Sequence, residues 1–294
     1  QIFCLVLKET WKMKMRPKPL KVQSENQWFQ RAEVLQRNRK KRNQHRQFLV
    51  EGVHSLNALV ANNAWAIEAL LYTPDRRLSD WASAILETAP ALHHLELSPQ
   101  LMDKLSDKDE PSELIAIVDM PTDDPARIPI KRDAFIVLAD RPQNPGNLGT
   151  LIRSCEAFGA HGLIVTGHAC DLYDPPTLRA ATGALFGLAT THIFSQDDLN
   201  TWLEQLRQQA PGLQMIGTSA HGETRLAHCP FTAPTLLVIG NEVVGLSRRI
   251  RELCDWVGSI PMSGQIPSLN MASAATVCLY EVQRQRMEIP GVIQ

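Results

Sequence analysis

The stretch NPGNLGTLIRSCEAFG, residues 144–159, follows closely on the apolar run AFIVLA at residues 134–139. A short apolar run that ends at a glycine-containing loop is typical of a buried strand. Apolar residues recur at helical spacing from about residue 148, which predicts that a helix follows the loop. A strand, a loop and a helix in this order are typical of a ligand-binding loop in an α/β fold.

The composition of this loop leaves several interpretations open. Gly146 and Gly149 permit positive φ angles and close approach of the backbone. Asn147 is either a turn residue in a left-handed conformation or a functional side chain. Arg153 lies off the apolar stripe and is either a solvated helix residue or a group that reaches back over the loop. The glycine spacing of a dinucleotide site and the Lys-Ser/Thr of a P-loop are both missing from this stretch, which sets aside a dehydrogenase.

Outward from this stretch, short apolar segments alternate with helical patterns as far as about residue 285. The expected strands cover residues 135–139, 162–165, 191–194, 214–218, 235–239 and 256–260, and the expected helices cover 148–158, 175–185, 197–209, 245–253 and 268–286. This alternation predicts a parallel sheet covered on both faces. Ligands bind such sheets at the carboxyl ends of the strands, where the loops 144–150, 240–245 and 261–270 carry unusual residues.

Two of these loops place polar residues beside expected helix starts. Glu242 is either an acid favoured by the positive end of a helix or a functional carboxylate. Ser268 is either an N-cap or a functional hydroxyl, and Asn270 is either a first-turn polar residue or a ligand-binding amide. Because polar residues recur at three strand ends, the pattern favours an enzyme.

The N-terminal part of the chain is basic and the remainder is acidic. Residues 1–50 hold 13 Lys and Arg against 3 Asp and Glu, a net charge of +10, whereas the remainder has a net charge of −11. This asymmetry indicates either a polyanion partner such as nucleic acid or a solvated tail. We expect four parts: a basic extension that is disordered or partly helical (1–46, with a helix over 26–42), a small α/β domain (47–120), a proline-containing linker (121–133) and a second domain (134–294).

Length and composition restrict the class of protein further. The 294 residues are enough for two domains, each with its own core. The six cysteines are scattered, without a Cys-x-x-Cys pair or a metal-ligand spacing, which predicts no metal site and reduced thiols in a cytoplasmic protein. No apolar run reaches the roughly 20 residues of a membrane span. Residues 2–7 make a poor signal peptide.

Three segments resemble the three motifs of the SpoU (TrmH-type) RNA 2′-O-ribose methyltransferases in the SPOUT superfamily. They are residues 144–159, the stretch VIGNEVVGLS at 238–247, and the stretch that begins IPMSG at 260 and continues through SLN at 268–270. Residues 48–118 resemble, more weakly, the RNA-binding domain that precedes the catalytic domain in ribosomal-RNA members. The resemblance implies a trefoil-knotted parallel-sheet catalytic domain, an exception to the rule that chains are unknotted.

The resemblance also implies the reaction and its residues. The enzyme would transfer a methyl group from S-adenosylmethionine to a ribose 2′-hydroxyl of structured RNA, as a homodimer without a metal. Ribosomal RNA is favoured over transfer RNA because of the first domain. By motif position, Gly240, Ile260 and Leu269 would contact the cofactor. Thr218 and Ser219, which end their strand, would line the adenine side of the cofactor. The catalytic positions are Asn147, Arg153, Glu242, Ser268 and Asn270.

Two questions remain open on these residues. Arg153 is either the base or an electrostatic activator of the ribose hydroxyl, and we favour activation because a guanidinium normally stays charged. The alternative function is a non-catalytic RNA-binding or ribosome-assembly factor on the same scaffold. A complete set of polar residues at the motif positions argues against this alternative.

Overall fold

The computed structural model describes residues 18–106 and 112–287. The chain forms two compact units, one from Gln1–Gly52 and Asn63–Met120, the other from Val53–Asn62 and Pro121–Gln294. The first 17 residues, which include Cys4 and the start of the expected basic extension, lie outside the described residues.

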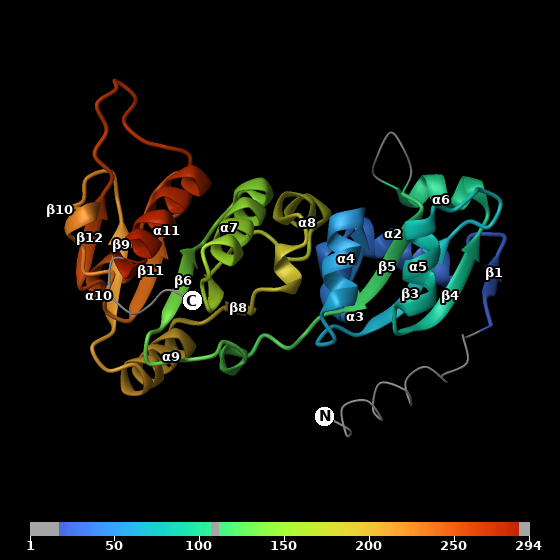
Figure 1. Cartoon of the computed structure of the whole chain (residues 1–294), viewed down its shortest axis with the longest axis horizontal. Helices are drawn as coiled ribbons and strands as arrows, with labels where there is room; N and C mark the ends of the chain where they lie inside the picture. Colours follow the sequence, from blue (N-terminus) through green and yellow to red (C-terminus); the bar gives the residue numbers. More distant parts are fainter. Residues whose placement is uncertain (1–17, 107–111, 288–294) are drawn as a thin grey trace. The chain divides into compact units, whose positions relative to one another are not determined.

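The first unit contains a five-stranded mixed sheet (Figure 1). Strands β1, β4 and β3 run parallel, and β5 is antiparallel to both β3 and β2. The order across the sheet is β1 (Leu20–Val22), β4 (Ala91–Leu97), β3 (Ile67–Tyr72), β5 (Leu114–Asp119) and β2 (Gln47–Glu51). The helices of this part of the chain are α2 (Gln27–Arg37), α3 (Arg39–His45), α4 (Val53–Ala61, grouped with the second unit), α5 (Asp80–Thr88) and α6 (Pro99–Leu105).

The basic N-terminal segment differs from its sequence-based expectation, because from residue 20 onward it is part of the first unit. Strand β1 pairs with β4, and α2 buries Phe29 and Leu35 in the same core as the sheet. The expected single helix is two helices, because Asn38 ends α2 and its side chain caps α3. Arg42 is only 2% exposed, and its guanidinium donates to the carbonyl oxygen of Leu35 at 3.0 Å. Part of the positive charge is therefore structural.

The second unit contains a seven-stranded sheet in which every pairing is parallel, which confirms the predicted parallel sheet. The order is β10 (Thr224–Arg225), β12 (Trp256–Ser259), β9 (Gln214–Thr218), β11 (Thr235–Ile239), β6 (Phe135–Asp140), β7 (Gly162–Thr166) and β8 (Thr190–Ile193). Strand β10 has two residues and was not predicted. Because all strands are parallel, their carboxyl ends lie at one edge of the sheet.

The α-helices between these strands are α7 (Pro145–Ala157), α8 (Pro175–Ala181), α9 (Gln196–Gln209) and α10 (Arg248–Leu253), and α11 (Met271–Met287) follows the last strand, β12. Helix α7 packs against both α8 and α11 (Figure 1). A Cβ atom at Gly149 would lie 2.3 Å from the carbonyl oxygen of Thr177, so this glycine allows the close approach of α7 and α8. Of the two properties that the sequence permits at Gly146 and Gly149, the structure uses close approach at Gly149, whereas neither residue has a positive φ because both lie within α7.

The C-terminal end of α11 is attached to the amino edge of the sheet by Arg286. Its guanidinium donates to the carbonyl oxygens of Phe231, Ala134 and Ala233, each at 3.0 Å. This attachment fixes the direction of α11, and the opposite end of α11 lies beside the site described below.

The cysteines in the described ranges are free thiols. Burial raises the pKa of Cys278 to about 12 and the pKa of Cys229 to about 11, so both stay protonated at neutral pH. Within residues 18–106 and 112–287, no helix combines the length and apolar character that a membrane span requires.

Candidate active site

The loop between β6 and α7 is fixed by Asn144. Its side-chain oxygen accepts a hydrogen bond from the backbone N–H of Asn147 at 3.0 Å, and Pro145 occupies the first helical position. Both features are favourable at a helix start, where backbone N–H groups lack partners within the helix. Asn147 is consequently a residue of the first turn of α7, and the interpretation as a left-handed turn residue is wrong.

Glu242 joins this helix start to the loop that follows β11. Its carboxylate accepts the backbone N–H groups of Gln143 and Asn144, each at 3.0 Å, and the side-chain amide of Asn147 at 3.3 Å. Burial raises the pKa of Glu242, but these hydrogen bonds together lower it more, so its pKa lies below the usual range. Glu242 is therefore a carboxylate at neutral pH and a weak proton acceptor.

Asn270 adds the start of α11 to the same cluster. Its side-chain amide donates to the side-chain oxygen of Asn147 at 2.9 Å. Its own side-chain oxygen accepts the backbone N–H groups of Ala272 at 2.9 Å and Ser273 at 3.3 Å. Asn270, and not Ser268, is therefore the residue that caps α11. Three of the sequence-predicted catalytic positions, Asn147, Glu242 and Asn270, are hydrogen-bonded neighbours.

The loop after β11 is held by residues that the sequence analysis missed. Asn241 accepts the backbone N–H of Val243 at 2.9 Å and donates to the carbonyl oxygen of Arg141 at 2.8 Å. Asp140 is buried, and its carboxylate accepts the backbone N–H of Ser247 at 2.7 Å. The sequence signal that could have identified Asp140 as a functional residue is an acidic side chain at the end of an apolar strand.

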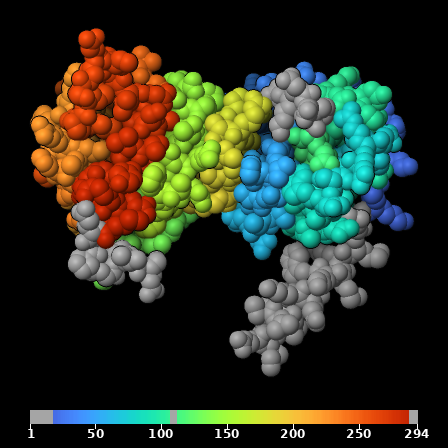
Figure 2. All heavy atoms as spheres, turned by 45° about the horizontal axis from the view of Figure 1, so that its top comes forward, coloured from blue at the N-terminus to red at the C-terminus, as the bar shows by residue number. Residues whose placement is uncertain are grey.

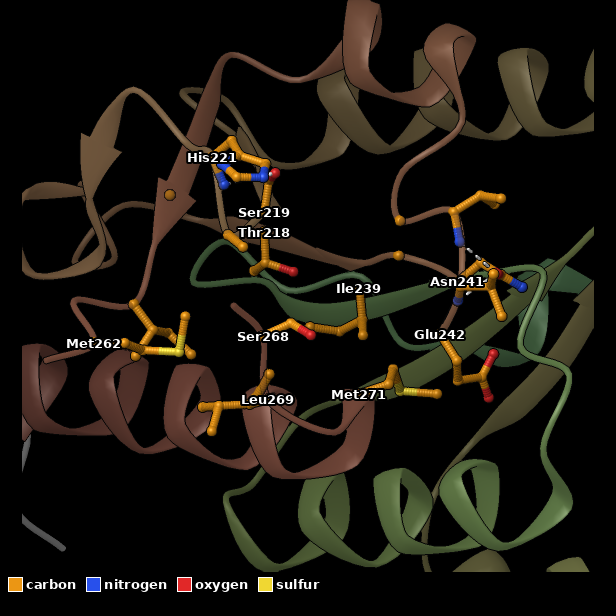
Figure 3. A pocket seen from close by; sticks show the side chains of 18 residues that line it. Thr218, Ser219, His221, Ile239, Asn241, Glu242, Met262, Ser268, Leu269 and Met271 are labelled. Atoms are coloured by element: carbon orange, nitrogen blue, oxygen red, sulfur yellow. Dashed lines mark hydrogen bonds between the residues drawn. The ribbon is translucent and has the colours of Figure 1, made fainter. Parts of the chain in front are cut away.

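A cavity of about 310 Å³ lies beside this cluster, at the carboxyl ends of β9, β11 and β12. Figure 3 shows Thr218, Ser219 and His221 on one side of it and Ser268 and Leu269 on the other. All four expected cofactor-binding residues line it, as do two of the five expected catalytic residues. The lining residues are Thr218, Ser219, Ala220, His221, Ile239, Gly240, Asn241, Glu242, Val243, Val244, Gly245, Gly258, Ile260, Met262, Ser268, Leu269, Met271 and Ala274.

Gly240 determines how closely the loop after β11 can turn. A Cβ atom at this position would lie 2.5 Å from the carbonyl carbon of Gly245 and 2.5 Å from the backbone nitrogen of Leu246. These contacts are with backbone atoms, so a side chain at position 240 requires the loop that lines the cavity to move.

Arg153 is the one expected catalytic residue that is neither in the lining nor in the hydrogen-bonded cluster. It lies on the exposed face of α7, and none of the residues in the described part of the chain forms a hydrogen bond or an ion pair with its side chain. Among the same residues, no group of three His, Cys, Asp or Glu side chains is arranged to hold a metal ion.

Comparison with known proteins assigns the class to which this fold and cavity belong. The family model of the SpoU rRNA methylases matches residues 134–280, and that of the SpoU L30e-like domain matches residues 26–116. The chain belongs to the SpoU rRNA methylase family, which confirms the resemblance inferred from the three motifs.

Individual relatives match both units. A 23S rRNA (uridine(2479)-2′-O)-methyltransferase of Streptomyces viridochromogenes is 44% identical over 272 residues, which cover 92% of this chain and 94% of the relative. The crystal structure of the SpoU methyltransferase AviRb from the same organism with AdoMet has a TM-score of 0.85 at 45% identity, covering 90% of this chain and 99% of AviRb. An AdoMet-bound rRNA methyltransferase of Sinorhizobium meliloti has a TM-score of 0.78 at 26% identity, covering 90% and 98%.

The lowered pKa of Glu242 predicts how activity depends on pH. Its charge stabilises the loops above its ordinary pKa of about 4.3, and this contribution is lost only as the pH falls through the lower folded-state value. We expect Glu242→Gln to lower kcat about tenfold through misplaced loops while leaving the shape of the pH–rate profile between about pH 6 and 9 unchanged. If the wild-type rate falls toward acidic pH and the rate of this variant does not, Glu242 would instead be the base that accepts the proton of the ribose hydroxyl.

Proposed function

We propose that this protein is a cytoplasmic S-adenosylmethionine-dependent methyltransferase that modifies a ribose 2′-hydroxyl of ribosomal RNA. The observation that carries the proposal is a cavity at the carboxyl edge of the parallel sheet that two of the three motif segments line. Asn147 of the first motif is hydrogen-bonded to both of these segments, through Glu242 and Asn270. The rRNA methyltransferase that is 44% identical over almost the whole chain supports the same reaction.

The cavity is suited to the cofactor. Its volume of about 310 Å³ lies within the range of small-molecule sites, which are mostly apolar with a few polar groups that set orientation. Ile260 and Leu269 offer apolar contacts, Thr218 offers a hydroxyl, and the loop at Gly240 offers backbone groups. The carboxylate of Glu242 favours a positive charge nearby. The cofactor supplies a methyl group on a positively charged sulfur.

The residues of the chain then have distinct roles in the reaction. The ribose oxygen forms a bond to the methyl carbon as the carbon–sulfur bond breaks, and the hydroxyl proton leaves to solvent. Arg153 stabilises the negative charge that develops on the ribose oxygen. Ser268 and Asn270 hold the ribose by hydrogen bonds, and Asn147 and Glu242 keep the loops in place. Fixed orientation lowers the barrier further.

The proposal includes a homodimer in which Arg153 completes the cavity of the partner subunit. Arg153 lies on the exposed face of α7, next to α11, whose surface carries the exposed side chains of Val277 and Tyr280. The surfaces of α7 and α11 adjoin, in green and red respectively, in Figure 2. Exposed apolar side chains beside a polar functional group are typical of an interface between copies.

The trefoil knot is a further part of the proposal. The segment 261–270 is exposed throughout, and the chain returns from it to place the start of α11 beside the loop after β11. Threading of this segment through that loop accounts for an α11 that starts beside Asn147 and packs along α7.

Transfer of a labelled methyl group tests the proposed function. The full-length protein is incubated with labelled S-adenosylmethionine and either protein-free 23S rRNA or bulk tRNA. We expect label in 23S rRNA, at a position that becomes resistant to alkaline hydrolysis because the 2′-oxygen is blocked. Binding of 23S rRNA without any transfer would support the alternative of a non-catalytic ribosome-assembly factor.

Two lysines of α3, the exposed Lys40 and the half-buried Lys41, predict part of the salt dependence of RNA binding. Deletion of residues 1–46 would remove β1 and α2 from the core, so point substitutions are the cleaner test. We expect Lys40→Gln with Lys41→Gln to reduce the slope of log Kd against log salt by about 1.5, since each lost phosphate contact removes roughly 0.7 to 0.9. Lys131→Gln, before β6, is the control and should leave the slope unchanged. An unaltered slope in the double variant would exclude α3 from the RNA interface.

A further inference from the structure

An exposed aromatic ring at the carboxyl edge of the second sheet has no role in the activity described above. Phe194 follows directly after β8 and is 65% exposed. One face of its ring stacks on the imidazole of His192, with ring centroids 3.8 Å apart and planes inclined by 27°. His192 is buried, and its Nε2 lies 2.7 Å from the carbonyl oxygen of Gly167. The phenyl ring is therefore supported on one side by a fixed group.

The position of Phe194 in the sheet relates it to the cavity. Asp140 at the end of β6 pairs with Thr166 at the end of β7, and Thr166 pairs with Ile193 at the end of β8. Phe194 therefore extends beyond the same edge at which the segments after β9, β11 and β12 form the cavity. Three strand spacings separate β8 from β11, a distance of roughly 15 Å. A few nucleotides of an extended strand can span this distance.

Polar and basic groups lie between Phe194 and the cavity. The guanidinium of Arg141, after β6, is ion-paired with Asp140 but about a third exposed, and its side chain runs along Gly167. Gln143 donates from its side chain to the carbonyl oxygen of His168, whose own side chain is exposed. This edge offers cationic and hydrogen-bonding groups that complement a phosphate backbone.

We infer that Phe194 stacks on an unpaired base of the RNA substrate, near the nucleotide whose ribose enters the cavity. Proteins that read single-stranded RNA stack splayed bases on aromatic side chains, and such stacking is sequence-tolerant. Arg141 lies where a phosphate between the stacked base and the modified nucleotide would pass. This inference rests on the proposed RNA methyltransferase function and adds that the substrate is unpaired on this side of the modified ribose. Phe194 is thus a positioning residue.

Binding of an RNA octamer provides the first test, with the full-length protein as the wild type and as Phe194→Ala, Phe194→Trp and Trp256→Ala variants. Trp256 is an exposed aromatic residue at the start of β12, at the amino edge of the same sheet and therefore away from the cavity, and it serves as the matched control. We expect Phe194→Ala to raise the Kd for single-stranded octauridine about 5- to 100-fold, the range that corresponds to one stacked base. Phe194→Trp should restore binding, and RNA should quench its added tryptophan fluorescence.

Kinetics on protein-free 23S rRNA distinguish a positioning role from a general loss of structure. Phe194→Ala should raise KM for RNA more than it lowers kcat and should leave the Kd for S-adenosylmethionine and the melting temperature unchanged. Unchanged octauridine binding and an unchanged KM in Phe194→Ala would overturn the inference, even if wild-type protein methylates rRNA. A shift in oligomeric state in Phe194→Ala would also overturn it, by identifying a protein contact. Absence of methyl transfer by wild-type protein would instead count against the proposed function, while Phe194-dependent binding of octauridine stays measurable.

Discussion

Replacing Arg153 by alanine should lower the rate of methyl transfer about 100- to 1000-fold, the range for loss of one preorganised group that stabilises developing charge. The side chain is exposed and has no partner among the described residues, so its removal should change the free energy of unfolding by no more than about 0.5 kcal/mol. The cavity lining does not include it, so S-adenosylmethionine should bind as in the wild type. Single-turnover transfer measures the rate, calorimetric titration measures the affinity for S-adenosylmethionine, and denaturant titration measures the free energy of unfolding.

Two further variants make the result for Arg153 specific. Arg153→Lys keeps the charge but not the planar group with several donors, and we expect it to recover only part of the rate. Arg207→Ala removes another partly exposed arginine, which pairs with Asp255 at 3.5 Å, and it should keep full activity. Full activity in Arg153→Ala would show that the ribose hydroxyl is activated by another group.

Replacing Gly240 by alanine should weaken S-adenosylmethionine binding about 5- to 150-fold, which corresponds to the roughly 1–3 kcal/mol that an extra methyl group costs in a closely packed site. The new methyl group would lie 2.5 Å from backbone atoms of Gly245 and Leu246, so the loop has to open. Gly187→Ala is the matched control, because a Cβ atom there meets only ordinary contacts at 3.7 Å or more. Cofactor affinity by calorimetry should fall in the first variant and not in the second. Equal affinities would mean that the loop after β11 does not hold the cofactor.

Mixing these two impaired variants, at a concentration of S-adenosylmethionine too low to saturate Gly240→Ala, tests whether the cavity is completed by the partner subunit. A mixed dimer combines an intact cavity from the Arg153→Ala subunit with an intact Arg153 from the Gly240→Ala subunit, which gives one working site. An equimolar mixture after subunit exchange should therefore regain about one quarter of wild-type activity, since half of the dimers are mixed and each has one of two sites. No recovery would place Arg153 and the cavity of the same subunit in one site.

The sequence was sufficient for the second unit because its local patterns and its tertiary structure agree. Strands β9 and β11 have the bounds that their apolar runs predict, and parallel pairing follows from the alternation with helices. The four expected cofactor residues line one cavity because the carboxyl ends of parallel strands must meet at one edge. The chemical roles of these residues come from the family resemblance of the three motifs and not from the local patterns.

The missed features depend on contacts between residues far apart in the chain. Strand β1 has three residues and is stabilised by parallel pairing with β4, so its sequence alone carries little signal. Asn38 divides one helical pattern into two helices because its side chain caps the second, which periodicity does not reveal. Asp140 and Asn241 act through backbone groups of distant loops, so their roles appear only once those loops are positioned.

The hydrogen bond between Asn147 and Asn270 joins residues that are 123 positions apart, and Glu242 bonds to the same Asn147. During synthesis, Asn147 emerges from the ribosome long before Asn270 has been made. A growing chain therefore has no complete catalytic centre until α11 has been made and has docked. Under this arrangement, a chain that has been made only as far as β12 has no complete hydrogen-bonded cluster and is not expected to modify RNA.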